Sequence, residues 1–214
     1  MAKSYAQSQA PEQGKRRGDR LLKKIKDQVA ELWNYVNSCK PAYTSVRLMF
    51  QDEASFGRIN KPKYCWCKKG TRPTVPCLHV REYRYAYGAV EPKTGDSHFL
   101  VLPRCDTACM NYFLKSLGEQ YPDSIILLVV DGASWHRSKG LEIPENIRLF
   151  FLPPATPEMN PIEQIWKEIR KRGFKNEIFA TLEKVINRLC DTICSLTNDT
   201  VKSITGRDWI AGIC

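Results

Sequence analysis

The chain has 214 residues, of which 43% are hydrophobic and 10% aromatic, enough for one medium domain with a buried core and an appended arm. No apolar run approaches the ~20 residues that a membrane-spanning helix needs, and the N-terminal region lacks the apolar stretch of a signal peptide. We therefore expect no membrane partner and a cytoplasmic location. The net charge of +10, with a pI near 9.2, favours a polyanionic partner, of which nucleic acid is the commonest.

The N-terminal region, residues 1–44, is predicted to be a basic and partly disordered arm. Residues 1–17 are polar and are expected to be disordered or frayed, whereas apolar residues at helical spacing predict one amphipathic helix over 18–37. Residues 1–40 hold nine Lys or Arg against four Asp or Glu. Such a charge suits a nucleic-acid contact, although a basic terminus can also serve solubility alone.

The segment from 45 to 118 is predicted to contain three strands and a helix. The expected strands are residues 45–52, 82–90 and 97–103, with the turn "EPKTGD" between the last two. A helix is expected near 106–118, with Asp106 or Thr107 as its N-cap.

The remainder is predicted to add two buried strands and two helices. "SIILLVVD", residues 124–131, has the continuous apolar character of a strand covered on both faces. "IRLFFLP", residues 147–153, is a second such strand that a double proline ends. Helices are expected over 161–172 and 178–196. This order predicts an α/β fold, a mixed five-stranded sheet flanked by helices, over residues 45–214.

The nine cysteines do not predict a disulfide framework in a chain without export signals. Cys65, Cys67, Cys77 and His79 could suggest a zinc site, but their spacing is tighter than that of a usual zinc knuckle. The default expectation is that these cysteines lie buried or half-buried on strands.

Three carboxylates form the candidate metal site. Asp52 and Asp131 fall at the C-terminal ends of predicted strands, where sites of α/β sheets form, and Glu163 lies one turn into the helix after "LPPATPEMNP". Taken singly, either aspartate could be an ordinary turn residue and Glu163 could simply complement a helix dipole. Together they could hold two Mg²⁺ or Mn²⁺ ions, which prefer oxygen ligands and serve phosphodiester chemistry.

Three blocks carry a resemblance to a known family. "FQDEASFG", "VVDGASWHRS" and "LPPATPEMNPIEQIW" resemble the catalytic domain of the mariner-like (Tc/mariner) superfamily of DDE transposases, and the bacterial insertion-sequence branch in particular. The likeness covers roughly residues 45–210. It implies an RNase H-like fold, with Asp52, Asp131 and Glu163 as the catalytic, metal-binding triad.

Two further residues lie within these blocks. Glu53 is adjacent to Asp52, so its side chain should point to the opposite face of the strand, and we expect a structural role. His136 could touch DNA phosphate or support a metal ligand, or it could cap a helix or pack beneath the site.

The sequence departs from the family pattern in three respects. Thirty-one residues separate Asp131 from Glu163, slightly fewer than is usual in the superfamily, and Ala155 replaces a frequent aromatic residue. The region before the catalytic blocks has room for one helix, not for the paired helix-turn-helix modules of family members. We therefore expect the catalytic half of a transposase, with a separate helix-turn-helix polypeptide as a possible partner.

The function expected from these features is metal-dependent DNA strand cleavage and strand transfer, the chemistry of DNA transposition. The expected partners are element ends and target DNA, bound by a homodimer in the bacterial nucleoid. Three alternatives stay open: a catalytically silent remnant that binds DNA, a metal-dependent nuclease that cuts without joining, and a zinc-stabilised interaction module. The sequence does not define the terminal repeat or the target site.

Overall fold

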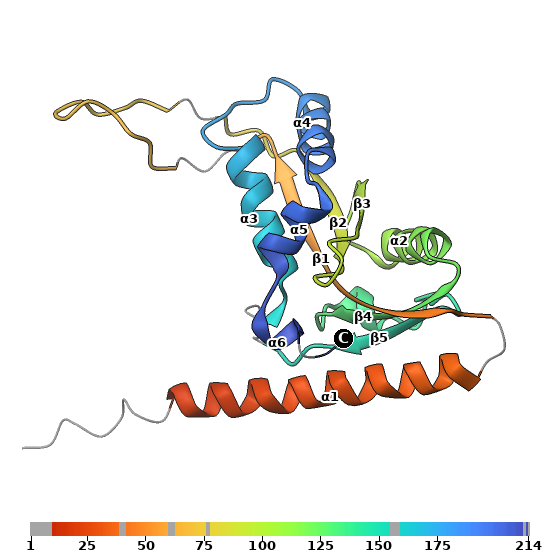
Figure 1. Ribbon diagram of the computed structural model, residues 1–214. Helices are drawn as coiled ribbons and strands as arrows, with labels where there is room; N and C mark the ends of the chain where they lie inside the picture. Colours follow the sequence, from red (N-terminus) through yellow and green to blue (C-terminus); the bar gives the residue numbers. More distant parts are fainter. Residues whose placement is uncertain are drawn as a thin grey trace, which may run out of the picture.

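A five-stranded mixed sheet forms the centre of the molecule in the computed structural model (Figure 1). The model describes residues 10–38, 42–59, 63–75, 78–154, 159–211 and 213. The strands are β1 (Ser45–Gly57), β2 (Tyr83–Val90), β3 (Ser97–Leu102), β4 (Ser124–Val130) and β5 (Ile147–Phe151). Their order is β3-β2-β1-β4-β5, with antiparallel pairing among the first three and parallel pairing of β1 with β4 and of β4 with β5. The predicted fold class is confirmed.

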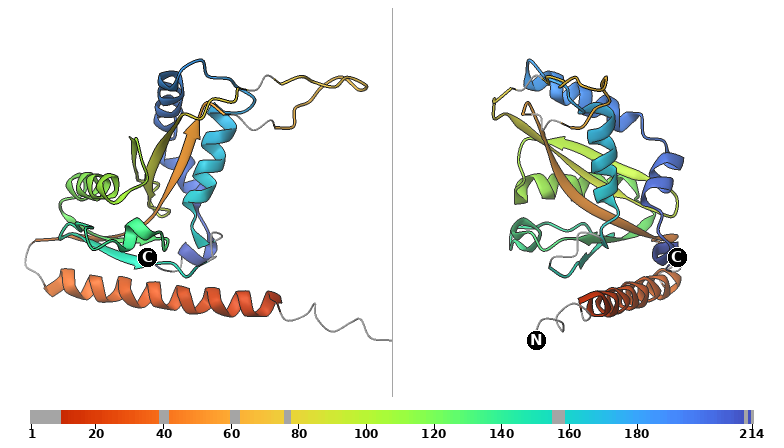
Figure 2. Two further views of the ribbon diagram at one scale, coloured as in Figure 1. Left: turned by 180° about the vertical axis from the view of Figure 1, so that it is seen from behind. Right: turned by 90° about the vertical axis from the view of Figure 1, so that its left-hand side faces the viewer.

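Helices cover both faces of this sheet (Figure 2). They are α1 (Ala10–Ser38), α2 (Thr107–Gln120), the short 3-10 helix η1 (Ser134–Arg137), α3 (Ile162–Gly173), α4 (Leu182–Cys194), α5 (Asn198–Thr205) and α6 (Asp208–Ala211). Within the described part of the chain, none of them combines the length and apolarity needed to cross a membrane.

Two layers of core follow from the alternation of side chains along β1 and β4. Leu48 and Phe50 of β1 join Leu127 of β4 in a core that α1, α3, α4 and α5 cover, whereas Met49 and Leu128 face α2. Because successive strand residues point to opposite faces, adjacent residues at the site below must also face different layers.

Several helix boundaries match the sequence pattern, and α1 differs from it. Asp106 caps α2 as predicted, accepting a hydrogen bond from the backbone N–H of Cys109. The helix predicted over 18–37 instead begins at Ala10, so residues 10–17, expected to be disordered or frayed, are helical. A proline at position 11 is compatible with this start, because a helix tolerates proline in its first turn. Leu21, Ile25 and Val29 pack α1 into the core.

The C-terminal region also differs from expectation. The last helix predicted over 178–196 begins at Leu182, where Thr181 caps it by accepting from the backbone N–H of Lys184. Two short helices, α5 and α6, follow it, and the sequence pattern did not predict either one.

Candidate active site

Asp52 lies inside β1, not at its end as predicted. The strand continues to Gly57 because β2 remains paired with it, Asp52 standing opposite Gly88. The pairing of β1 with β4 stops earlier, at Phe50 and Val129. Asp52 therefore lies just past the point where β1 and β4 separate, and it faces the core layer that α3 covers.

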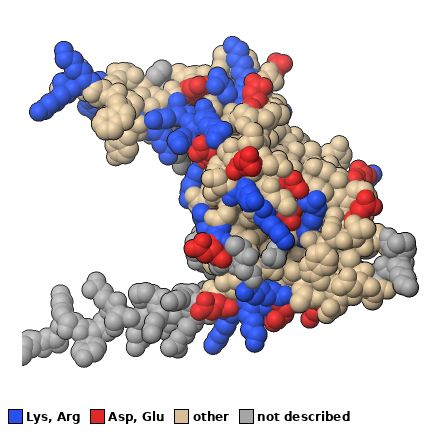
Figure 3. Space-filling model, viewed as in Figure 1, with Lys and Arg blue, Asp and Glu red and all other residues tan. Residues whose placement is uncertain are grey.

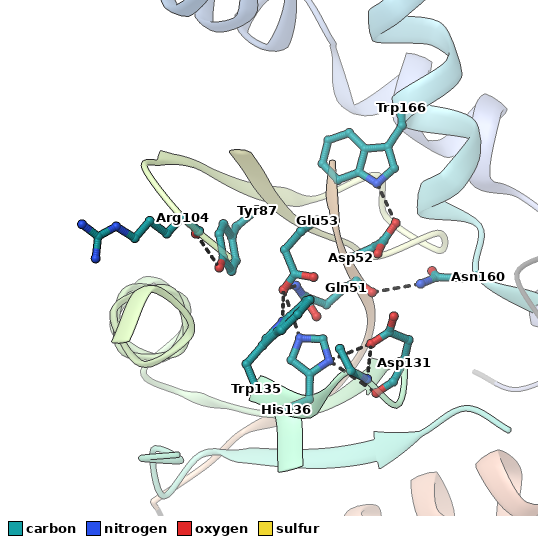
Figure 4. Close-up of polar contacts among 11 residues, drawn as sticks. Gln51, Asp52, Glu53, Tyr87, Arg104, Asp131, Trp135, His136, Asn160 and Trp166 are labelled. Atoms are coloured by element: carbon teal, nitrogen blue, oxygen red, sulfur yellow. Dashed lines mark hydrogen bonds and ion pairs between the residues drawn. The ribbon is translucent and has the colours of Figure 1, made fainter. Parts of the chain in front are cut away.

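A buried tryptophan of α3 holds the Asp52 carboxylate. Trp166 Nε1 donates a hydrogen bond to Asp52 Oδ2 at 2.9 Å (Figure 4). Its ring reaches this position because residue 88 is glycine: a Cβ there would lie 2.7 Å from Trp166 Cη2. Trp166 lies on the buried apolar stripe of α3, and its indole N–H, which a buried tryptophan must satisfy, is the sequence signal that could have indicated this polar role.

The pKa of Asp52 is raised to about 7. Burial is the main cause, because it disfavours the ionised form, and the neighbouring carboxylates of Glu53 and Glu163 add repulsion. The hydrogen bond from Trp166 opposes both effects. Asp52 and Glu163 thus lie close enough to interact electrostatically, although they are far apart in the sequence.

Asp131 follows the last residue of β4, as predicted. Extending the β1–β4 register by two residues sets Asp131 opposite Asp52. Its Oδ1 accepts a hydrogen bond from the backbone N–H of Ala133 at 2.9 Å, so Asp131 also forms the local turn that the Asp-Gly pair indicated. Its side chain is about half exposed, at 52%, and therefore open to a ligand.

His136 joins Asp131 to Glu53 beneath the surface of the site. The imidazole Nδ1 lies 2.8 Å from Asp131 Oδ1 and Nε2 lies 3.0 Å from Glu53 Oε1, and the His136 side chain is fully buried. Figure 4 shows Glu53 pointing away from Asp52, toward His136. Two of the roles left open for His136 agree with this geometry, since the buried ring packs beneath the site and also contacts the candidate ligand Asp131. Glu53 faces the opposite side of β1, as predicted.

The contacts of His136 fix the charge of Asp131. Burial alone would lower the pKa of His136, but hydrogen bonds to Asp131 and Glu53 outweigh it and raise the pKa to about 9. The imidazole is therefore charged at neutral pH and both of its N–H groups donate. In turn, the hydrogen bond from His136 lowers the pKa of Asp131, so Asp131 stays ionised.

Glu163 stands in the first turn of α3, which Asn160 fastens to β1. Asn160 Nδ2 donates to the backbone carbonyl of Gln51 at 2.9 Å, and both residues are buried. Pro161 provides the helical N-cap, with φ −66° and ψ −21°. The loop between the two prolines and Asn160 includes residues 155–158, among them Ala155, which lie outside the described residues.

The donor chemistry and charge of this site fit a divalent cation. Asp52 keeps one carboxylate oxygen free of Trp166, and Asp131 keeps one free of His136. The repulsion that Glu53 and Glu163 exert on Asp52 would fall if a cation bound. As the described side chains stand, no three His, Cys, Asp or Glu residues are gathered tightly enough to hold an ion. The fit therefore lies in ligand type and charge.

The cysteine prediction was wrong for Cys65 and Cys67. Both are exposed thiols in the segment between β1 and β2, and the described residues of that segment include no strand. His79 is also exposed, and Cys77 lies outside the described residues. Among the residues described, no further ligand side chain groups with Cys65 and Cys67.

Comparison with solved structures defines the class of fold. The Mos1 transposase paired-end complex with left transposon end is similar at a TM-score of 0.58 and 12% identity, over 96% of this chain and 62% of that one. The mariner Mos1 paired end complex with Mg gives a TM-score of 0.54 at 15% identity, over the same shares. The chain thus spans less than two thirds of these transposase chains. The five-stranded mixed sheet is that of an RNase H-like domain.

Sequence comparison defines the family. The DDE superfamily endonuclease family matches residues 47–186, more than half of the chain. An uncharacterized protein, y4pE/y4sA of Sinorhizobium fredii (strain NBRC 101917 / NGR234), is 37% identical over 130 residues, which cover 59% of this chain and 96% of that protein. The chain therefore belongs to the DDE superfamily endonucleases, as the three sequence blocks predicted, and this bacterial relative is consistent with the predicted bacterial branch.

Proposed function

We propose that this chain is the catalytic domain of a transposase that cuts DNA and joins the freed end to a target. The observation that carries the proposal is the convergence of Asp52 from β1 and Glu163 from α3, close enough for repulsion to help raise the pKa of Asp52 to about 7. Asp131 follows the adjacent parallel strand β4 on the same side. Acidic residues that the fold holds close together despite their electrostatic repulsion are typical of sites that bind cations or catalyse reactions.

In this proposal Asp52, Asp131 and Glu163 hold two divalent cations, Mg²⁺ or Mn²⁺. When bound, such ions lower the pKa of an attacking hydroxyl and stabilise the leaving oxygen of a phosphodiester. The protein supplies the arrangement: His136 keeps Asp131 ionised and oriented, Trp166 orients Asp52, and Asn160 fixes the start of the helix that carries Glu163.

The reaction would proceed by two phosphodiester exchanges. In the first, water attacks the phosphorus atom at the element end, and the 3′ oxygen leaves and takes up a proton. In the second, that 3′-hydroxyl attacks a target phosphodiester, so one P–O bond forms as another breaks. The number of phosphodiester bonds is conserved in the second step, which therefore needs no external energy source.

A homodimer on paired DNA ends, with a separate helix-turn-helix polypeptide for end recognition, is part of the same proposal. The similar solved complexes are named paired-end complexes, which supports a dimeric arrangement here. Sedimentation with and without a DNA end tests this expectation: a complex of two protein chains with two DNA ends supports it, and a complex of a single chain with a single DNA end contradicts it. The proposed working location is the nucleoid.

The test of activity uses a labelled oligonucleotide duplex carrying the end of the flanking element. With Mg²⁺ or Mn²⁺ the protein should nick the end and transfer it to a target duplex. Asp131→Asn should lose both steps while keeping its fold by circular dichroism, and Asp191→Asn, at an exposed position on α4, should retain them. Cutting without joining would instead identify a nuclease, and DNA binding without cutting would identify a silent remnant. Full activity of Asp131→Asn would refute the assigned site.

A further inference from the structure

Residues 63–75, the described stretch in the middle of the segment between β1 and β2, project from the body of the protein (Figures 1 and 2). We call this stretch the aromatic loop. It leaves the sheet beyond Gly57, the end of β1, on the side where α3 ends and α4 begins. Neither its place in the fold nor its composition is explained by the metal site, because Asp52 lies five residues before the end of β1.

The base of the aromatic loop is fastened to the body by hydrogen bonds. Lys63 N donates to Asn176 Oδ1 at 2.7 Å, and Asn176 Nδ2 returns a hydrogen bond to the Lys63 carbonyl at 3.0 Å. On the sheet side, the Arg58 backbone N–H donates to the Glu82 carbonyl at 3.1 Å and their side chains form a 2.8 Å ion pair. The base therefore has a defined position relative to α3.

The tip of the loop contains a turn of its own. Thr71 N donates to the Lys68 carbonyl at 3.0 Å, and Gly70 supplies the positive φ, 85°, that such a turn requires. Tyr64 and Trp66 precede this turn, two residues apart, so in an extended chain they share one side.

Both aromatic side chains are fully exposed, at 101% for Tyr64 and 103% for Trp66. Single exposed apolar residues are ordinary, but two large aromatic rings together on one projecting segment mark a contact surface. Tryptophan and tyrosine are also the residues on which nucleic-acid bases stack.

The charge of the aromatic loop selects the partner. Residues 63–75 include four cations and no Asp or Glu, the cations being Lys63, Lys68, Lys69 and Arg72. Figure 3 shows Lys and Arg, and no acidic side chain, on the projecting part. Exposed aromatic rings within a purely cationic segment fit DNA, whose phosphates meet the cations and whose bases meet the rings.

Helix α3 connects this loop to the proposed site. Its first turn carries Glu163 and its last turn carries Arg170, Lys171 and Arg172, next to the segment where Asn176 holds the base of the loop. The 12 residues of α3 span about 18 Å, the length of about five base pairs of duplex. DNA leaving the site along α3 would therefore meet the loop.

We infer that the aromatic loop is a DNA-binding element that holds the duplex outside the reaction site, with Trp66 and Tyr64 stacking on unpaired or unstacked bases and the four cations contacting phosphates. This inference rests on the proposed function for its choice of DNA and adds the residues that would hold the DNA beyond the scissile bond.

The test measures binding of the full-length protein to a fluorescent duplex with a single-stranded extension. Trp66→Ala should weaken binding about tenfold, and Tyr112→Ala, an exposed aromatic on α2 at 62%, should not weaken it. The double variant Lys68→Gln, Lys69→Gln should reduce the slope of log K against log salt by about 2. Lys115→Gln, at an exposed position on α2, should leave the slope unchanged.

Three results would overturn the inference. One is unchanged affinity and salt slope in the Trp66 and lysine variants while the protein cuts DNA normally, which would leave the proposed function intact. Another is loss of self-association without loss of DNA affinity, measured by sedimentation, which would make the loop a contact between copies. The third is no DNA binding by the wild-type protein, which would remove the proposed function as well.

Discussion

Replacing Asp52 by asparagine should make the metal-free protein more stable. Asparagine keeps an oxygen that can accept from Trp166 Nε1, and it removes a buried charge that neighbouring carboxylates repel. Residues that serve activity often lower the stability of the folded protein, so replacing them can raise stability while removing activity. We therefore expect Asp52→Asn to melt at a higher temperature than the wild type and to lose cleavage.

The magnitude follows from the pKa of Asp52. A pKa of about 7 in the folded protein, against an ordinary value of 3.8, corresponds to a cost of about 4 kcal/mol for the ionised carboxylate at pH 8. Because Asp52 keeps some solvent access, this figure is an upper estimate. Because the pKa of Asp52 is raised on folding, the folded state holds the proton more tightly than the unfolded state. The free energy of unfolding is therefore greater at low pH and declines as pH rises from about 4 toward 7.

The assay is urea unfolding at pH 5 and pH 8 in the presence of a chelator. The stability advantage of Asp52→Asn over the wild type should be at most about 1.7 kcal/mol at pH 5 and should grow to at most about 4 kcal/mol at pH 8, whereas Asp191→Asn should track the wild type at both. In excess Mg²⁺ the difference in free energy of unfolding between Asp52→Asn and the wild type should narrow, since only the wild type is stabilised by metal binding through mass action. An equal difference at both pH values, or a destabilised Asp52→Asn at pH 8, would refute the reasoning.

The remaining predictions concern the groups around the carboxylates. The free energy that His136 contributes, measured against His136→Asn by urea unfolding at stepped pH, should be complete below the ordinary pKa of 6.5 and lost as pH rises through about 9; a difference independent of pH would contradict it. Asn160→Ala should lower the free energy of unfolding by about 1–3 kcal/mol, because it strips the buried Gln51 carbonyl of its donor, and a loss near zero would argue against that anchor. Gly88→Ala should cost about 1–3 kcal/mol by crowding Trp166 and should change the near-ultraviolet dichroism, which a tolerated substitution would not do.

Features set by local periodicity were predictable from the sequence. The apolar stripe of α3 and the continuous apolar run of β4 predicted both elements nearly to their observed ends. The extent of β1 was not predictable, because the part beyond Asp52 exists only through pairing with β2. The strand ends at Gly57, five residues later than the predicted end at Asp52.

The residues of the candidate site could be predicted from the sequence, but the hydrogen bonds that support them could not. Motif spacing selected Asp52, Asp131 and Glu163, but their supporting contacts join distant positions. His136 reaches Glu53 across 83 residues and Trp166 reaches Asp52 across 114. No local pattern encodes such a contact, since it depends on which elements the completed sheet brings together.

The parallel pairing of β1 with β4 has a consequence for synthesis of the protein. The two strands meet across a separation of 79 residues, as in the contact between Ser45 and Ser124, and Glu163 follows later still, after β5. At ordinary elongation rates of about 5–20 residues per second, a ribosome needs roughly four seconds or more to deliver β4 after β1. A nascent or prematurely terminated chain therefore carries Asp52 without its proposed partners. Under the proposed function, synthesis itself delays DNA cutting until α3 has emerged, so abortive fragments ending before α3 would pose no danger to the genome of the cell that makes them.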